Sequence, residues 1–150
     1  MIRILFICHG NICRSAAAHM ILQKMVLDAG LSDLFYIDSA ATSTEEIGST
    51  VYPPMKRVLQ SMNIPILGHR ARQVKSREYA DWDYIIGMDN ANMRNLNRIF
   101  DGDPDHRLSM LMSWTGEDGR EVEDPWYTGR HDAVAKQIER GCRAILDKLA

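Results

Sequence analysis

Short apolar runs alternate with longer amphipathic stretches along the chain. The residues from Ile2 to Ile7 are almost all apolar, which is typical of a strand buried on both faces of a parallel sheet. The stretch from Ala16 to Ala29 carries its apolar residues at helical spacing, and Gly30 is a stop signal directly after it. The pattern therefore predicts a strand followed by a helix at the beginning of the chain.

The same alternation continues to the C-terminus. Further apolar runs predict strands at Phe35–Ile37, Tyr84–Met88 and Leu108–Met112. Helices are predicted after Pro53-Pro54, over about 90–99, and over 131–149. Strands that alternate with helices predict an α/β fold, a single doubly wound domain over residues 1–150 in which helices cover both faces of a four-stranded parallel sheet.

The composition is that of an ordinary globular domain, but the charge and the lengths of the apolar stretches exclude some classes of function. A chain of 150 residues with 45% hydrophobic and 25% charged residues is ordinary for a globular domain. The net charge of -2 argues against a general nucleic-acid binder. No stretch approaches the length of a membrane-spanning helix, so no membrane insertion is expected.

The cysteines and the N-terminal run indicate the expected compartment. Three cysteines are an odd number, and Cys8 and Cys13 lack a second pair at metal-ligand spacing, so neither a disulfide framework nor a metal site is expected. The first apolar run is too short for a signal peptide. Together these features predict a cytoplasmic protein with reduced thiols.

The first strand is followed by the loop Cys8-His9-Gly10-Asn11-Ile12-Cys13-Arg14-Ser15. A tight loop that ends at a helix N-terminus turns several N–H groups inward and forms an anion site. Gly10 allows close approach of the backbone, and the planar fork of Arg14 matches two phosphate oxygens. The same positive environment favours a thiolate at Cys8, placed for attack on phosphorus. Ser15 is expected to cap the helix or to donate a hydrogen bond to that sulfur.

Other polar residues are predicted to converge on this loop. Ligands of parallel sheets bind beyond the carboxyl ends of the strands. Cys8, Ser39 and Asp89 are expected at such ends, together with the loop after the fourth strand. Asp89 can cap the helix that follows it, orient Arg14, or do both.

The loop resembles the signature Cys-x-Gly-Asn-x-Cys-Arg-Ser of the low-molecular-weight protein tyrosine phosphatases. A second match, Asp124-Pro125-Trp126-Tyr127, looks like the general-acid loop of that family. Further segments resemble the family in the right order: Asp38-Ser39-Ala40-Ala41-Thr42-Ser43, His69-Arg70-Ala71-Arg72-Gln73 and Met88-Asp89. The resemblance covers essentially the whole chain.

The resemblance implies hydrolysis of phosphotyrosine and aryl phosphates through a cysteinyl phosphate. Cys8 would be the nucleophile, Arg14 the phosphate clamp and Asp124 the general acid and then base. The implied partners are phosphotyrosine-containing proteins and phosphate-like oxyanions, with no cofactor, because loop N–H groups and Arg14 replace a metal ion. The residues of the implied supporting network are Asn11, Ser15, Ser39 and His69. Cys13 is implied to form a protective disulfide with Cys8 under oxidation, or only to pack beneath the loop.

The substrate pocket departs from the family pattern. His9 stands at a variable loop position and is expected to face solvent or substrate. Glu45 replaces an aromatic side chain that often forms one wall of the ring slot, so Trp126 and Tyr127 are left to supply the aromatic wall. Ala16 stands where the family usually has proline.

Several alternative functions stay open on the sequence. A phosphoarginine phosphatase shares the scaffold but typically has threonine where Ile12 stands, while Glu45 could attract a guanidinium. An arsenate reductase needs further cysteines, and none lies between Cys13 and Cys142. A binding module without activity is disfavoured because Cys8, Arg14 and Asp124 occur together.

Overall fold

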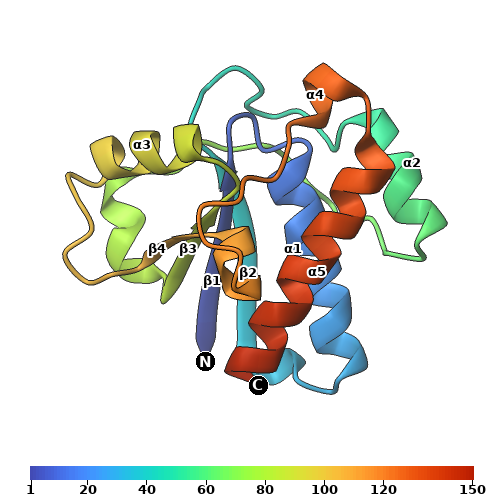
Figure 1. Cartoon of the computed structure of the whole chain (residues 1–150), viewed down its shortest axis with the longest axis horizontal. Coiled ribbons are helices and arrows are strands. Elements are labelled where there is room, and N and C mark those ends of the chain that lie inside the picture. The colour runs from blue at the N-terminus through green and yellow to red at the C-terminus, as the bar shows by residue number, and fades with distance from the viewer.

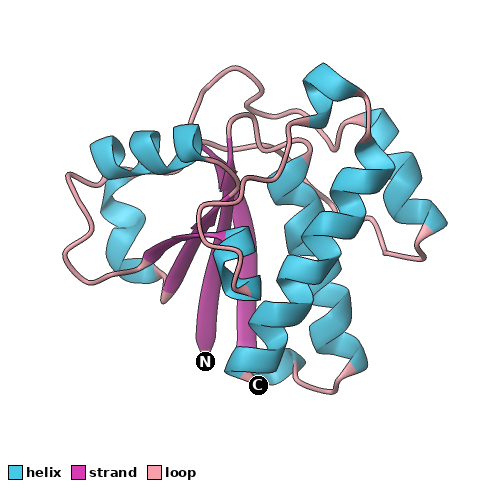
Figure 2. Cartoon of the chain, viewed as in Figure 1, coloured by secondary structure: helices cyan, strands magenta, loops and turns pink.

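The computed structural model describes residues 1–150 and contains one sheet of four parallel strands with helices on both sides (Figures 1 and 2). The strands are β1 (Ile2–Cys8), β2 (Phe35–Ala41), β3 (Tyr84–Gly87) and β4 (Leu108–Met110). Their order across the sheet is β2-β1-β3-β4, and each neighbouring pair is parallel. The predicted α/β class and the four-stranded parallel sheet are confirmed.

Helices α1 and α5 pack together on one face of the sheet, and α3 covers the other face, as Figure 1 shows. The helices are α1 (Arg14–Asp28), α2 (Pro53–Ser61), α3 (Asn90–Ile99), α4 (Pro125–Thr128) and α5 (His131–Leu149). Three 3-10 helices join them: η1 (Ser32–Leu34), η2 (Ser76–Asp81) and η3 (Leu111–Thr115). No helix has the length and apolar character needed to cross a membrane.

The near-continuous apolar run of β1 serves both faces of the sheet. Ile4 and Phe6 belong to the large core cluster that includes α1 and α5, whereas Leu5 and Ile7 belong to the smaller cluster on the opposite face. All four side chains are fully buried. Alternate side chains of a strand point to opposite faces of the sheet. A strand whose two faces are both covered therefore carries apolar side chains on both of them.

The strand order reverses at β1, since β2 lies on one side of it and β3 on the other. The loop after β1 and the loop after β3 therefore leave the sheet side by side at its carboxyl edge. Such a switch point creates a crevice in which ligands bind. The fold thus brings Cys8 and Asp89 to the same crevice.

Two of the predicted strands, β1 and β3, end within one residue of the structure, and the other two differ by more. The predicted strand Phe35–Ile37 continues to Ala41, because Phe6 to Cys8 of β1 pair in parallel register with Ser39 to Ala41. Ser39 therefore lies within β2 and not beyond its end. Local hydrophobicity did not reveal this extension, since pairing with β1 sustains it across a polar segment.

The predicted strand Leu108–Met112 was too long. Strand β4 ends at Met110, and Leu111 and Met112 open the 3-10 helix η3. Both side chains are fully buried, and Leu111 atoms lie 2.5 Å from the place where a Cβ on Gly141 would stand. The apolar run is therefore core that packs against α5, and an apolar run alone does not distinguish a strand from a buried helical turn.

Candidate active site

The loop between β1 and α1 turns its carbonyl groups outward. The carbonyl oxygens of Cys8, His9, Asn11, Ile12 and Cys13 each accept a hydrogen bond from elsewhere in the chain. Their donors are, in order, the amide of Thr42, the amide and hydroxyl of Ser43, Nε2 of His69, the amide of Tyr52 and the amide of Ala17. This outward anchoring holds the loop from several sides.

The amide groups of the same loop are left for a ligand. The N–H groups of His9, Gly10, Ile12, Cys13 and Arg14 donate to no protein acceptor. A peptide N–H points away from its neighbouring carbonyl, so the outward carbonyls direct these donors inward. Converging N–H groups at the start of a helix form a cradle for an anion.

Cys8 lies at the floor of this cradle. Its side chain is 4% exposed, and its Sγ lies 3.0 Å from the hydroxyl of Ser15. The amides of Asn11 and Ser15 also point at the sulfur, at 3.3 and 3.4 Å. A sulfur that accepts several hydrogen bonds is stabilised whenever it carries negative charge, as a nucleophile or a leaving group does.

Ser15 donates or accepts at the sulfur instead of capping the helix. Helix α1 begins at Arg14, two residues earlier than predicted, with Cys13 at its N-cap and no side-chain cap. Ser15 lies inside the first turn, is fully buried, and contacts Cys8 and Nδ2 of Asn11. Of the two alternatives expected for Ser15, the contact with the sulfur is present and the cap is not, because Ser15 lies inside the first turn and not before it.

Arg14 is held by two groups that come from distant parts of the chain. Its Nη1 donates to Oδ2 of Asp89 at 2.9 Å and to the carbonyl of Val122 at 2.8 Å. Its Nη2 lies 3.5 Å from Oδ2 of Asp124. Only 3% of the side chain is exposed. The guanidinium is thus fixed at the cradle, with Nε and Nη2 not engaged in any protein hydrogen bond.

Burial and anionic neighbours shift the pKa of Arg14 in opposite directions. Burial by itself would lower the pKa of Arg14, but Cys8, Asp89 and Asp124 raise it above its ordinary value. Burial raises the pKa of the Cys13 thiol, and the nearby Cys8 and Asp124 raise it further. Arg14 is therefore a permanent cation, and Cys13 is a neutral thiol at neutral pH.

Asp124 faces the cradle from the start of α4. Its Oδ1 accepts the amide of Trp126 at 3.0 Å, so the carboxylate caps this short helix. Pro125 at the first helical position fits this arrangement. The other carboxylate oxygen faces Arg14. Asp124 lines the same cavity as Cys8 and Arg14, so the structure brings the three predicted catalytic residues together.

Asn11 and His69 hold the shape of the loop. Asn11 has a φ of 60°, a left-handed conformation that asparagine tolerates. Its Nδ2 donates to Ser15 at 2.8 Å, and its Oδ1 accepts the amide of Arg72 at 3.2 Å. His69 Nε2 lies 2.6 Å from the carbonyl of Asn11 and acts as the donor, because a carbonyl only accepts. These contacts agree with the supporting role predicted for both residues.

Ser39 does not take part in this network. Its side chain is buried, and its hydroxyl has no hydrogen-bond partner in the protein. The expected hydrogen bond from Ser39 to the loop is absent, since Ser39 lies within β2 in register with Phe6 and its buried hydroxyl has no partner there. Asp89 behaves as predicted in both ways, since Oδ1 caps α3 by accepting the amide of Asn92 at 2.8 Å.

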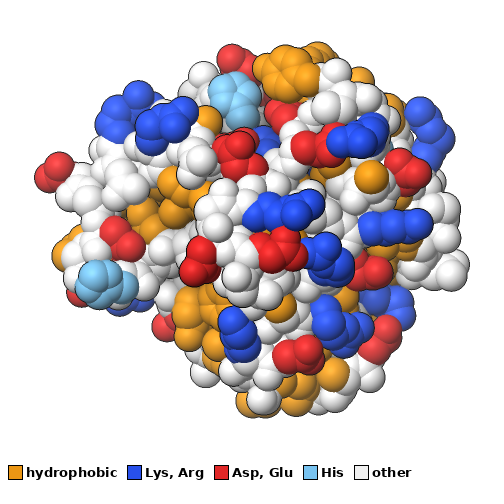
Figure 3. Space-filling model, in the orientation of Figure 1, with side chains coloured by type: hydrophobic (Ala, Val, Ile, Leu, Met, Phe, Trp, Pro, Cys, Tyr) orange, Lys and Arg blue, Asp and Glu red, His pale blue; other side chains and the backbone are white.

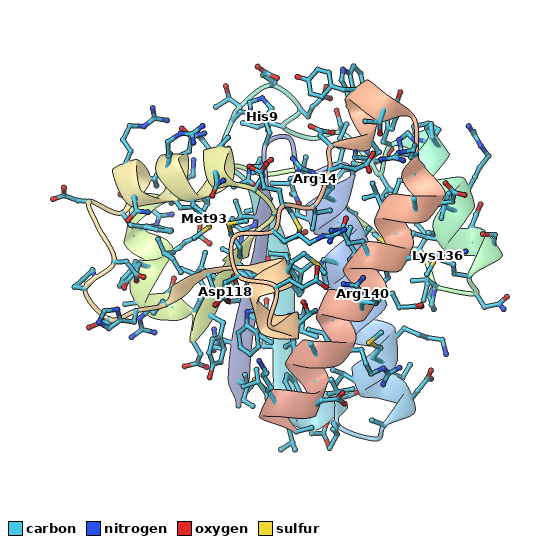
Figure 4. All side chains as sticks on the ribbon, viewed as in Figure 1. His9, Arg14, Met93, Asp118, Lys136 and Arg140 are labelled. Atoms are coloured by element: carbon cyan, nitrogen blue, oxygen red, sulfur yellow. The ribbon has the colours of Figure 1, made fainter.

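The cavity above Cys8 has about 130 Å³ of space and two kinds of wall. Figure 4 shows His9 and Arg14 at the same end of the sheet, where this cavity lies. On one side, His9 Nε2 lies 2.9 Å from Oε2 of Glu45. On the other side stand Trp126 and Tyr127, 59% and 83% exposed. The residues that line the cavity are Cys8, His9, Gly10, Ile12, Cys13, Arg14, Glu45, Glu46, Tyr52, Asp124, Trp126 and Tyr127.

Tyr52 belongs to this cavity and was missed by the sequence reasoning. Its ring lies 5.1 Å from that of Trp126 and 5.6 Å from that of His131, and its amide anchors the carbonyl of Ile12. No local pattern indicated this role, because the ring is placed beside the cavity by its contact with Trp126, which is far away in the sequence. No group of His, Cys, Asp or Glu side chains converges to hold a metal ion.

Comparison with known proteins gives consistent matches over nearly the full chain. The family model described as "Low molecular weight phosphotyrosine protein phosphatase" matches residues 3–150. The human protein named low molecular weight phosphotyrosine protein phosphatase is 39% identical over 152 residues, covering 97% of this chain and 94% of that protein.

Solved structures agree with this match. The crystal structure of YfkJ from Bacillus subtilis superposes with a TM-score of 0.95 at 33% identity and covers 99% of this chain and 94% of that chain. A Drosophila arginine phosphatase, DARP, superposes with a TM-score of 0.86 at 29% identity, over 97% of this chain and 96% of that chain.

Proposed function

The chain belongs to the low molecular weight phosphotyrosine protein phosphatase family and is a protein tyrosine phosphatase, and we propose that it works through a covalent phosphocysteine on Cys8. The observation that carries this proposal is the loop itself. Unpaired amides, the Cys8 sulfur and the fixed guanidinium of Arg14 surround one small cavity. This arrangement suits a tetrahedral oxyanion directly above a nucleophile.

In the first step, the Cys8 thiolate attacks phosphorus and forms the S–P bond. The bond from phosphorus to the phenolic oxygen breaks, and that oxygen takes the electron pair and a proton from Asp124. The loop amides and Arg14 stabilise the equatorial oxygens of the transferring group. These donors are already in position before the ligand arrives, so they need little reorganisation.

In the second step, water attacks the phosphocysteine. The Asp124 carboxylate accepts a proton from the water, the S–P bond breaks, and inorganic phosphate and the Cys8 thiolate result. The hydroxyl of Ser15, 3.0 Å from Sγ, stabilises the departing thiolate. Trp126 and Tyr127, exposed in the free protein, become covered when a phenyl ring enters the cavity between them and the loop.

A phosphoarginine phosphatase is the second candidate function. Glu45 places a carboxylate at the cavity mouth where the family often has an aromatic residue, and a structural neighbour is an arginine phosphatase. However, Glu45 is already engaged by His9. Ile12, which lines the cavity, also differs from the threonine typical of that branch. Phosphotyrosine is therefore the favoured substrate.

Arsenate reduction has no comparable support. Such a relay needs a second reactive thiol besides the loop pair, and the remaining Cys142 is fully buried and lies on α5. Burial also raises the pKa of the Cys142 thiol, with a further contribution from Glu139. We assign Cys142 to the core.

The proposal extends to regulation and location. Cys8 and Cys13 line the same cavity, so mild oxidation of Cys8 to the sulfenic acid can be followed by a disulfide with Cys13. This reaction requires a reducing compartment for recovery, and we place the protein in the cytoplasm.

A side-by-side assay tests the proposed substrate. The same peptide is prepared with phosphotyrosine or with phosphoarginine, and kcat/KM is measured for both. We expect the phosphotyrosine peptide to be hydrolysed with the higher kcat/KM. A higher kcat/KM for phosphoarginine would assign the chain to the second candidate function, and no turnover of either would reject both.

A further inference from the structure

The cavity above Cys8 continues into a groove that the catalytic residues do not use. A neighbouring hollow shares four residues with the cavity, namely Ile12, Glu46, Tyr52 and Trp126. That hollow in turn shares Thr50, Val51 and Arg70 with a third one, which is also lined by Lys56. The three hollows therefore adjoin one another between Cys8 and Lys56, and we call the two beyond the cavity the side groove.

The floor of the side groove is held by backbone hydrogen bonds. The amide of Gly48 donates to the carbonyl of Ala71 at 2.8 Å, and the amide of Ala71 donates to the carbonyl of Ser49 at 2.9 Å. Its other boundary is the entry of α2, where Tyr52 packs against Trp126 of α4. Helices α2 and α4 lie next to each other in Figure 1. These contacts therefore shape the side groove in the free protein, before any ligand binds.

The cations of the side groove form no ion pair, whereas Glu45 and Glu46 each hold a side-chain contact within the protein. Arg70 and Lys56 are exposed and form no ion pair. The only hydrogen bond of the Arg70 guanidinium goes to the carbonyl of Gly48, at 3.4 Å. Glu45 is paired with His9, and Glu46 accepts the hydroxyl of Ser49 at 3.0 Å.

Arg70 and Lys56 differ from the other surface cations because they line the side groove. Charges of both signs are spread over the face of the molecule shown in Figure 3. Arg57, the neighbour of Lys56 on α2, is also exposed and forms no ion pair, but it lines a separate hollow with Pro54 and Asp132. Arg57 therefore lies outside the side groove.

We propose that the side groove binds an acidic segment of the phosphoprotein substrate, with Arg70 and Lys56 as the residues that recognise it. This inference rests on the proposed function, because the phosphorylated residue must occupy the cavity above Cys8. A chain that leaves this cavity over the Tyr52 and Trp126 rings enters the groove. Its Asp and Glu side chains then meet the two free cations.

The test compares two phosphotyrosine peptides of equal length. One carries Asp and Glu on both sides of the phosphotyrosine, and the other carries Asn and Gln at the same places. A small aryl phosphate, which fills the cavity only, normalises the amount of competent enzyme. The wild-type protein should hydrolyse the acidic peptide with the higher kcat/KM, and the difference should shrink as salt is added.

Substitutions locate this preference. Lys56→Gln and Arg70→Gln should each lower the ratio of kcat/KM between acidic and neutral peptides by roughly two- to fivefold, which corresponds to one exposed charge pair. Arg57→Gln is the matched control on the same helix and should leave the ratio as in the wild type. The double variant Lys56→Glu/Arg70→Glu should prefer a peptide flanked by lysines, a gain that misfolding cannot produce.

Each outcome decides one of two questions. The side groove would be overturned as a binding site if the wild-type protein showed no preference for the acidic peptide, or if Arg57→Gln lowered the kcat/KM ratio as much as the groove variants do. In either case, turnover of phosphotyrosine would leave the proposed function intact. Failure of the wild-type protein to hydrolyse either peptide and the aryl phosphate would instead reject the proposed function.

Discussion

Asp89 holds Arg14 with one carboxylate oxygen and the first turn of α3 with the other. Oδ2 accepts Nη1 of Arg14 at 2.9 Å, and Oδ1 accepts the amide of Asn92 at 2.8 Å. Because the cap fixes the carboxylate, the helix that covers one face of the sheet also orients the guanidinium that faces the cavity. A single side chain thus links the stability of α3 to the geometry of the anion site.

Asp89→Ser should separate these two roles. Serine still caps α3 but is too short to reach Arg14. We expect kcat/KM to fall by roughly 10- to 100-fold through misplacement of the guanidinium. The change of cap should alter the free energy of unfolding by less than about 1 kcal/mol, whereas loss of the carboxylate beside the buried Arg14 should lower it by about 3 kcal/mol. Steady-state kinetics and urea denaturation measure the two quantities. A variant that keeps full activity would show that Val122 alone positions Arg14.

Cys8→Ser should abolish turnover of an aryl phosphate while vanadate still binds. The loop amides and Arg14, which hold the anion, do not depend on the sulfur. Isothermal titration with vanadate and a turnover assay check this pair of outcomes. Rapid quenching of the wild-type protein should find the phosphoryl label on Cys8, and label on Cys13 or Cys142 would contradict the mechanism.

Asp124→Asn should reduce activity most for phosphate esters with poor leaving groups. A leaving group that is already a weak base needs little protonation, so its hydrolysis depends less on the acid. The measurement is kcat for a series of substituted phenyl phosphates. An equal loss over the whole series would point to a structural role for Asp124 as the cap of α4.

Cys13 should protect Cys8 from permanent oxidation by peroxide. Peroxide converts the Cys8 thiolate to a sulfenic acid. The Cys13 thiolate then attacks the Cys8 sulfur, the S–O bond breaks, and hydroxide leaves as the disulfide forms. Treatment with peroxide followed by thiol should restore the wild-type protein, whereas Cys13→Ser should stay inactive at the same dose. Since burial raises the pKa of Cys13, protection should improve as the pH is raised. Equal recovery of the two proteins would leave Cys13 with a packing role only.

His19 should make the fold less stable in mild acid. Burial lowers the pKa of His19, and His69 lowers it further against the opposing effect of Asp38. Because the unfolded chain then binds a proton at a higher pH than the folded chain does, stability falls as the pH drops through the ordinary histidine range. His19→Gln should flatten the loss between pH 7 and pH 5, measured by urea denaturation. An unchanged slope would assign the acid sensitivity to other groups.

The sequence by itself determined those parts of the site that depend on residues close together in the chain. The apolar run Ile2–Ile7 predicted the first strand, and the glycine and the spacing of the residues after it predicted the loop and the helix. The predicted helix at 90–99 agrees with α3, because Asp89 is a cap that acts locally.

Tertiary structure decided everything that depends on residues far apart. Pairing with β1 extended β2 through Ser39 and removed that serine from the loop network. Packing of Leu111 against Gly141 turned the end of an apolar run into η3. The Val122 carbonyl on Arg14 and the Tyr52 ring beside Trp126 carry no local signal. Such contacts are fixed by the closure of the sheet and the packing of its helices, which no short window of sequence contains.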